Sequence, residues 1–394
     1  MPTLLPRDIT IPEPGSDTAT KVLSLTIRRA LKDLMRLTAS ARVPALREFK
    51  PCLQQLLRDN PGALASSLRS PTIGGLLRCL RFWARPVSID FEAGVTELLA
   101  TLLTDLAHAD ALSRPLSLRR LPPRVVSMAA AREFVFPEGA HSAVFSRATV
   151  RMLLPDGEEL EIDLREPDSA PSYFKISPSL ALATIDNNPL SMFEAHPDKE
   201  GNQLDLGGRP ASEWVEIIQR SLELIGRHMP ELRAELDLFV RQIVPVGFDT
   251  HRHLSASYQE IIGTVYMTLH PQLMTMVEAI IHEFQHNKLH ALLELDPLLD
   301  NAFHPLYPSP VRPDPRPLQG VLLAVHAFQP VALLYERMRE AGAPLSRHPE
   351  FERRFQEIIA GNAEAAEVLL EHGQATPTGR AVLDEIERWR DHAW

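Results

Sequence analysis

The stretch Met274–Leu295, MTMVEAIIHEFQHNKLHALLEL, decides how the rest of the chain is interpreted. It contains His282-Glu283-Phe284-Gln285-His286, an HExxH pentapeptide. Residues i and i+4 lie on one face of an α-helix, so both imidazoles can point at one metal ion. Histidine is the commonest metal ligand, and HExxH on a helix is a known metal-binding arrangement. The pattern predicts a metal site at His282 and His286. The alternative is two satisfied histidines on a partly apolar helix face.

The flanks of this stretch predict a buried helix. Pro271 suits a first helical turn, and Asp296-Pro297 ends the segment. The residues before the first histidine are apolar nearly all round, which is typical of a helix inside a core. Ionisable side chains in a core are costly unless a ligand satisfies them, and a metal ion would do so.

A third ligand must come from outside the pentapeptide. His290 continues the stripe, but it lies about 12 Å from His282 along the helix axis, at 1.5 Å per residue. His326 is the best candidate, because it follows far enough along the chain to return on a second helix and has apolar neighbours. The competing ligands are Glu294, His304, Asp314 and Glu336.

Composition excludes several classes of protein. The chain has 394 residues, of which 44% are hydrophobic and 23% charged, as in a soluble globular protein. The net charge of −10 argues against nucleic-acid or anionic-membrane binding. Cys52 and Cys79 are the only cysteines, so a disulfide framework and a thiolate metal site are excluded. No signal-peptide pattern and no run of 18 apolar residues is found, and we expect a cytoplasmic protein.

Periodicity predicts an α+β fold that is mainly helical, with a small antiparallel sheet in the middle section. Residues 1–120 form an N-terminal helical region after an extended arm, and its charged helices could bind a peptide. Residues 121–394 form an α+β catalytic region that contains the HExxH helix. Alternating residues over about 124–190 predict strands, with Pro155-Asp156-Gly157 as a hairpin turn.

The remaining segments lie directly before and after the HExxH helix in the sequence. Short strands are predicted at Ile243–Phe248 and Ile261–Leu269, with His251 and His253 in the loop between them. An HxH pair in a loop can bind a metal ion, but the pattern favours two solvent-facing histidines. After the motif, the Pro-rich stretch His304–Pro317 predicts a stiff, extended connection near polyproline II. An apolar helix over Leu318–Gly342, kinked near Pro330, then carries His326.

Two chemistries fit these residues. In the first, Zn²⁺ is held by both histidines and a third residue, and Glu283 is the general base of a metallopeptidase. In the second, three side chains hold Fe(II) and leave positions open for a 2-oxoacid and O2. A 2-oxoacid needs a cation for its distal carboxylate, and Arg316 or Arg312 could supply it. For both arginines, the alternative is a solvent-facing side chain in a Pro-rich loop.

The run HEFQHNKLHALLELDPLL, with YPSPVRPDPRPLQG and AVHAF after it, resembles the HExxH-motif proteins of bacterial peptide-modification gene clusters. These look like 2-oxoglutarate- and iron-dependent peptide β-hydroxylases. The resemblance spans roughly 180–340 and includes IDNNPLSMFEAHPDKEGNQLDLGG and HLSASYQEIIGTVYMTL. It implies Fe(II), O2 and 2-oxoglutarate as cofactor and cosubstrates, and hydroxylation of a side-chain β-carbon in a ribosomally made precursor peptide. It also implies iron ligands at His282, His286 and His326, with Arg316 as the 2-oxoglutarate contact.

Two absences weaken the peptidase hypothesis. No clear downstream glutamate stands where a thermolysin-like enzyme would offer its third ligand, and the HExxHxxGxxH extension is missing. Under the iron hypothesis Glu283 need not be a base. The third hypothesis is a non-catalytic binding module in which the metal or the histidines are structural.

Overall fold

The computed structural model describes residues 4–40, 43–83, 89–154, 156–166, 171–186, 188, 204–309, 312–392 and 394. The N-terminal part contains five helices and six short strands. They are α1 (Thr18–Ser40), α2 (Pro44–Asp59), α3 (Pro61–Leu68), α4 (Pro71–Trp83), α5 (Ile89–His108), β1 (Leu116–Leu118), β2 (Arg124–Ser127), β3 (Arg132–Val135), β4 (Ser142–Ser146), β5 (Thr149–Leu153) and β6 (Glu159–Asp163).

The C-terminal part carries the HExxH helix, α8. Its helices are α6 (Ala211–His228), α7 (Pro230–Phe239), η1 (Gln259–Ile261), α8 (Leu273–Leu293), α9 (Leu318–Glu340), η2 (Pro344–Arg347), α10 (Pro349–His372) and α11 (Pro377–Arg390). Its strands are β7 (Tyr173–Lys175), β8 (Ala181–Ala183), β9 (Gln242–Phe248), β10 (Ser255–Ala256), β11 (Thr264–Leu269), β12 (Leu306–Ser309) and β13 (Arg312–Pro317).

The predicted fold class is confirmed: the protein is α+β, mainly helical, with small antiparallel sheets. The sheet β1-β4-β5-β6 is antiparallel throughout, and β5 and β6 pair across the predicted turn, of which Asp156 and Gly157 are described. A second sheet has the order β10-β11-β9-β8-β7. In it β9 runs parallel to both β8 and β11, while the edge strand β10 is antiparallel to β11. The sequence reasoning found β9 and β11 but not their parallel pairing.

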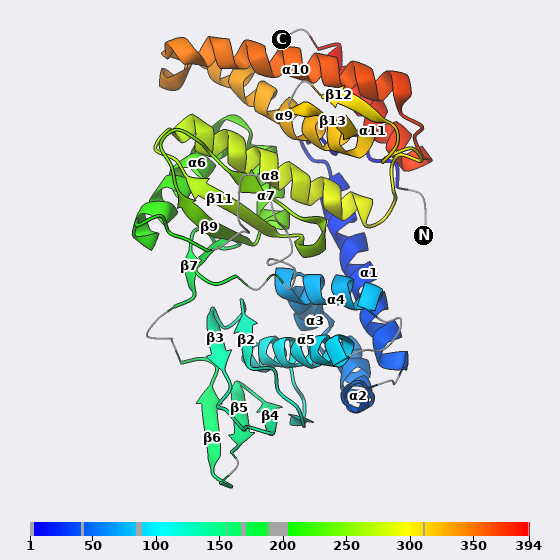
Figure 1. The fold of residues 1–394 in the computed structure, drawn as a ribbon, viewed down its shortest axis with the longest axis vertical. Coiled ribbons are helices and arrows are strands. Elements are labelled where there is room, and N and C mark those ends of the chain that lie inside the picture. The colour runs from blue at the N-terminus through cyan, green and yellow to red at the C-terminus, as the bar shows by residue number, and fades with distance from the viewer. Residues whose placement is uncertain are drawn as a thin grey trace.

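The buried apolar residues form two large groups, and Figure 1 shows the helices and strands that contribute to them. The N-terminal core joins α2–α5 and the C-terminal half of α1 to strands as far as Leu164. The C-terminal core joins Ile9 and the start of α1 to α6–α11 and their sheet. Strands β4 and β5, which follow residue 120, pack with the N-terminal core, so the two groups of buried residues do not divide at the point where the two predicted regions meet. Helix α1 contributes to both cores.

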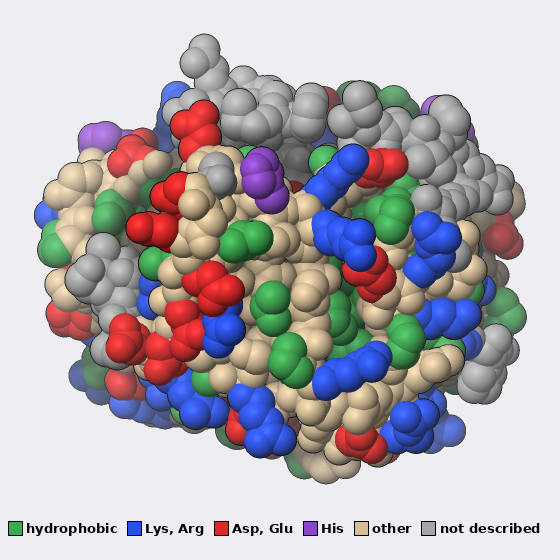
Figure 2. Space-filling view, turned by 90° about the horizontal axis from the view of Figure 1, so that it is seen from below, with side chains coloured by type: hydrophobic (Ala, Val, Ile, Leu, Met, Phe, Trp, Pro, Cys, Tyr) green, Lys and Arg blue, Asp and Glu red, His purple; other side chains and the backbone are tan. Residues whose placement is uncertain are grey.

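The free end of the N-terminal core is of mixed character. Figure 2 looks at the molecule from this end and shows basic, acidic and scattered hydrophobic side chains close together. A face of mixed charge favours neither sign of partner. The peptide-binding role of residues 1–120 therefore stays a prediction.

Helix α8 lies between the second sheet and α9, as Figure 1 shows. Helices α8 and α9 run antiparallel, because Glu278 contacts Tyr335 while His282, one turn later, contacts Phe328. Helix α9 is long and apolar enough to cross a membrane, but 72% of its apolar window is buried inside the protein. That degree of burial is typical of a core helix in a soluble protein.

Two segments differ from the sequence-based expectation. The Pro-rich stretch is a two-stranded antiparallel hairpin, β12–β13, in which Tyr307 pairs with Arg316. Prolines are tolerated there because each strand has an unpaired edge. The N-terminal arm is drawn into the C-terminal core, where Ile9 and Thr10 are fully buried. Glu385 accepts hydrogen bonds from the backbone N–H groups of Thr10 and Ile11, and Gln285 donates to the Thr10 carbonyl.

Candidate metal centre

Helix α8 brings three metal-ligating side chains together. One ligand atom from each of His282, Glu283 and His286 lies within 4.8 Å of the others. The two imidazole rings are 4.3 Å apart between centroids and meet edge to face, at 77°. This is what the i, i+4 spacing predicts. Within the described part of the chain, these three side chains are the cluster of His, Cys, Asp or Glu residues that could hold a metal ion.

Glu283 is fixed by the edge strand of the sheet. Its side chain is 2% exposed, and the hydroxyls of Ser255 and Ser257 donate to its two oxygens at 2.7 and 2.6 Å. Asn287, one turn later, donates to the Glu283 and Thr264 carbonyls and accepts from the Gly263 N–H. Helix α8 is thereby held against the start of β11, and the carboxylate is held in one orientation.

Burial favours the neutral form of His286 and His290. Burial lowers the pKa of His286, an effect that the nearby Glu283 partly opposes. Burial, followed by His286 and Arg78, lowers the pKa of His290 to about 3. Neutral imidazole is the form that binds a metal ion. The Nδ1 atom of His286 is buried and has no hydrogen-bond partner within the described chain, so a metal would satisfy an otherwise unpaired polar atom.

Aromatic rings surround the two motif histidines. The His282 ring lies 4.7 Å from the Phe328 ring on α9, and the His286 ring lies 6.2 Å from His290. Phe328 provides an apolar surface on the α9 side of the site. Ser255 of β10 and Ser257, just after that strand, provide polar groups on the sheet side. The arrangement provides two nitrogen donors, one fixed carboxylate and a partly apolar wall.

His326 does not join this group. It is fully buried on α9, and its Nε2 lies 3.3 Å from the Ile9 carbonyl. Burial, together with the nearby Lys288 and His286, lowers its pKa well below the usual range. Its ligand role stays a prediction. The competing ligands have other surroundings: Glu294 pairs with Arg29, Arg78 and Arg81, Asp314 with Arg316, Glu336 with His392, and His304 is exposed.

The predicted 2-oxoglutarate arginines lie in the β12–β13 hairpin. Arg316 pairs with Asp314 at 2.9 Å, and 37% of its side chain is exposed. Leu318, the first residue of α9, is about 15 Å along the helix axis from Phe328 at 1.5 Å per residue. The Arg312 side chain lies outside the described part of the chain, although its backbone pairs with Ser309. The ion pair of Arg316 is with Asp314, and its contact with 2-oxoglutarate stays a prediction.

Sequence reasoning missed the residues that hold the site. Ser255 and Ser257 stand two apart in HLSASYQE, and on a strand such residues face the same side, so the SxS spacing was a usable signal. Arg78 gave no such signal. It lies on α4, more than 200 positions before Glu294 in the sequence, yet its Nε is 3.5 Å from the Glu294 carboxylate.

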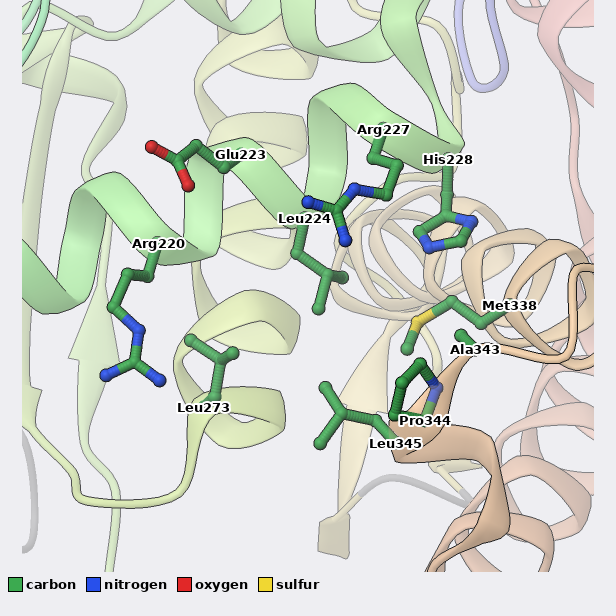
Figure 3. Close-up of a pocket in the computed structure, with 10 residues that line it drawn as sticks. All are labelled: Arg220, Glu223, Leu224, Arg227, His228, Leu273, Met338, Ala343, Pro344 and Leu345. Atoms are coloured by element: carbon green, nitrogen blue, oxygen red, sulfur yellow. The ribbon is translucent and has the colours of Figure 1, made fainter.

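A pocket of about 230 Å³ lies beyond the N-terminal end of α8 (Figure 3). Apolar side chains of Leu224, Leu273 and Met338 line it, with Arg220 and Arg227 on the α6 side. Leu273 is nine positions before His282, which is about 14 Å along α8. This pocket is separate from the candidate metal centre.

Comparison of the sequence with known protein families and with curated proteins finds no match.

Proposed function

We propose that the protein is an Fe(II)- and 2-oxoglutarate-dependent hydroxylase of a peptide side chain. The observation that carries the proposal is the group of His282, Glu283 and His286 on one buried helix. Two histidines and one carboxylate are the donor set typical of non-haem iron sites with open positions. The resemblance described above supports the cosubstrate, the β-carbon and the ribosomally made precursor peptide. In this proposal the enzyme acts in the cytoplasm, where its two buried cysteines would stay reduced.

The chain's own residues have separate tasks in this proposal. His282 and His286 would hold the metal through neutral imidazoles, and Glu283 supplies the nearest carboxylate. Bound Fe(II) would supply O2 activation, in which 2-oxoglutarate is oxidised to succinate and CO2 and one oxygen atom enters a substrate C–H bond. Ser255 and Ser257 keep the Glu283 carboxylate oriented, and Phe328 provides an apolar boundary. The cation for 2-oxoglutarate rests on the sequence alone, since the ion pair of Arg316 is with Asp314.

The edge strand supports a peptide as substrate. Strand β10 ends the five-stranded sheet and carries Ser255, which contacts Glu283. The free edge of a strand presents unpaired N–H and C=O groups, to which an extended peptide can bind as an added strand. A peptide bound there would pass close to the metal ligands.

A zinc metallopeptidase is the second candidate. The position of Glu283 beside both histidines favours it, because the general base of such an enzyme stands there. Both Glu283 oxygens accept a serine hydroxyl, and each keeps a second lone pair that could take a proton from water. The missing HExxHxxGxxH extension and the lack of a clear downstream glutamate rank the peptidase below the hydroxylase.

The test uses the full-length protein and 2-oxoglutarate. Co-expression with a precursor peptide from the same gene neighbourhood, followed by mass spectrometry, should show one added oxygen atom that depends on iron and 2-oxoglutarate. Cleavage of the peptide by a zinc-loaded protein would instead establish the peptidase. The His282→Ala variant is the control and should yield unmodified peptide in either case.

A further inference from the structure

A small pocket between the two cores is lined by three arginines. Arg69 at the end of α3, Arg78 on α4 and Arg241 before β9 contribute to it, and its other walls come from α1, α7 and Ile262. No carboxylate is among its lining residues within the described chain. Three cations around one small, partly buried pocket are unfavourable unless an anion accompanies them.

The guanidinium groups are incompletely satisfied. The Nε atoms of Arg69 and Arg241 are buried and have no hydrogen-bond partner in the described part of the chain, and that of Arg78 has only the ion pair with Glu294 at 3.5 Å. The Arg69 guanidinium donates to the Leu238 carbonyl, and the Arg78 guanidinium makes a long contact of 3.4 Å to the Glu260 carbonyl. The Arg241 side chain has neither a hydrogen bond nor an ion pair with any described residue. Buried guanidinium donors ordinarily have partners, so these point to a missing acceptor.

The nearby carboxylates are already engaged. Glu294 lies between Arg29, Arg78 and Arg81, and Asp33 pairs with Arg81 as well, so two negative charges serve three positive ones. Asp237 pairs with Arg233 and accepts the Ser179 hydroxyl. Burial lowers the pKa of Arg69, Arg78 and Arg241, and Arg69 lowers that of Arg241 further. Because arginine stays charged in proteins, this strain would be relieved by a bound anion.

The size of the pocket limits what can bind. Its volume is about 40 Å³, which is room for about three water molecules or one compact anion. Helix α4 also starts here, after Ser70, and its N-terminal end favours negative charge. Arginine binds carboxylate through parallel N–H groups and also accepts a halide as a point charge.

We propose that Arg69, Arg78 and Arg241 form a binding site for one small anion, a halide or a single carboxylate group, which holds the N-terminal core to the C-terminal core. The site is independent of the proposed hydroxylase activity. Bound anion joins α3 and α4 to the residue before β9, and so stabilises the contact between the cores.

The test measures thermal unfolding of the full-length protein in increasing sodium chloride or sodium acetate. Ionic strength is kept constant with the sodium salt of a bulky sulfonate buffer that the pocket cannot admit. We expect a rise in Tm that saturates, and the anion with the lower midpoint identifies the source. Arg69→Gln and Arg241→Gln should raise the midpoint at least tenfold, because each removes a charged donor. Arg119→Gln, at an exposed arginine paired with Glu48, should leave it unchanged.

A Tm that rises without saturation, or an equal midpoint in wild type and Arg241→Gln, would overturn the proposal. If the glutamine variants do not fold, a crystal of the wild-type protein soaked in sodium bromide decides the question. An anomalous bromide peak among the three arginines supports the site, and its absence rejects it. Iron binding, measured on Arg241→Gln in parallel, should be normal, which separates this site from the metal centre.

Discussion

The Ser257 hydroxyl donates to the Glu283 carboxylate at 2.6 Å, which ties the edge of a sheet to the acidic residue of the HExxH helix. Groups that orient a metal ligand commonly contribute 10- to 100-fold to metal affinity. We expect Ser257→Ala to weaken Fe(II) binding by about tenfold or more, as measured by anaerobic titration. Ser221→Ala is a matched control, since that hydroxyl donates to the Ile217 carbonyl within α6. Equal weakening in both variants would mean that Ser257 has no special role.

Glu283 and His326 compete for the third ligand position. Because Glu283 lies with both histidines and His326 faces the Ile9 carbonyl, we expect Glu283→Gln to reduce iron stoichiometry more than His326→Gln. Iron is measured by elemental analysis after desalting, with His286→Ala as the metal-free reference. Loss of iron in His326→Gln, with iron retained in Glu283→Gln, would restore the sequence-based assignment of His326.

Arg316 is expected to matter less than the sequence indicated. It is paired with Asp314 on a hairpin and is partly exposed, so Arg316→Ala should change the 2-oxoglutarate concentration for half-maximal succinate formation by no more than about twofold. Removal of a buried carboxylate-binding arginine would cost far more, about 2–5 kcal/mol. A large rise in the 2-oxoglutarate requirement would return Arg316 to the site.

Lys288 is an ionisable residue of α8 that contributes to stability. It is fully buried and pairs with Glu235 at 2.8 Å. Lys288→Met leaves a buried carboxylate unpaired and should lower the free energy of unfolding by about 3–5 kcal/mol, as measured with urea. Adding Glu235→Leu should recover much of that loss. Lys21→Met, at an exposed pair with Asp17, should cost about 0–1 kcal/mol and serves as the control.

Asp105 predicts a pH dependence in the N-terminal core. Burial raises its pKa to about 7, although the Ser127 hydroxyl opposes this shift. The folded chain then keeps a proton that the unfolded chain loses above its ordinary pKa, near 3.8. The contribution of Asp105 is therefore present at about pH 4 and is lost as the pH rises to about 7.

The Asp105→Asn variant isolates this contribution, because it cannot titrate. Urea unfolding of both proteins between pH 4 and pH 8 should show the wild type losing stability relative to the variant up to about pH 7, with a constant difference above it. A difference that does not vary with pH would show that Asp105 is ionised throughout.

The helices and the shared face of the two motif histidines could be predicted from short-range sequence patterns. The i, i+4 spacing of His282 and His286 determines a shared face, and alternation identified β9 and β11. What the sequence did not show depends on contacts between distant segments. Burial of Ile9 against His326 and the approach of Arg78 to Glu294 join residues more than 200 positions apart. The hairpin in place of a polyproline segment depends on pairing between two strands, which proline content alone does not predict.

The most direct test of the central claim is succinate formation by the full-length protein. The protein is loaded anaerobically with Fe(II) and 2-oxoglutarate in the presence of a co-expressed precursor peptide, and then exposed to O2. We predict about one succinate for each oxygen atom added to the peptide, with neither product from His282→Ala or His286→Ala. An iron-loaded wild-type protein that binds the peptide but leaves 2-oxoglutarate unchanged would contradict the account.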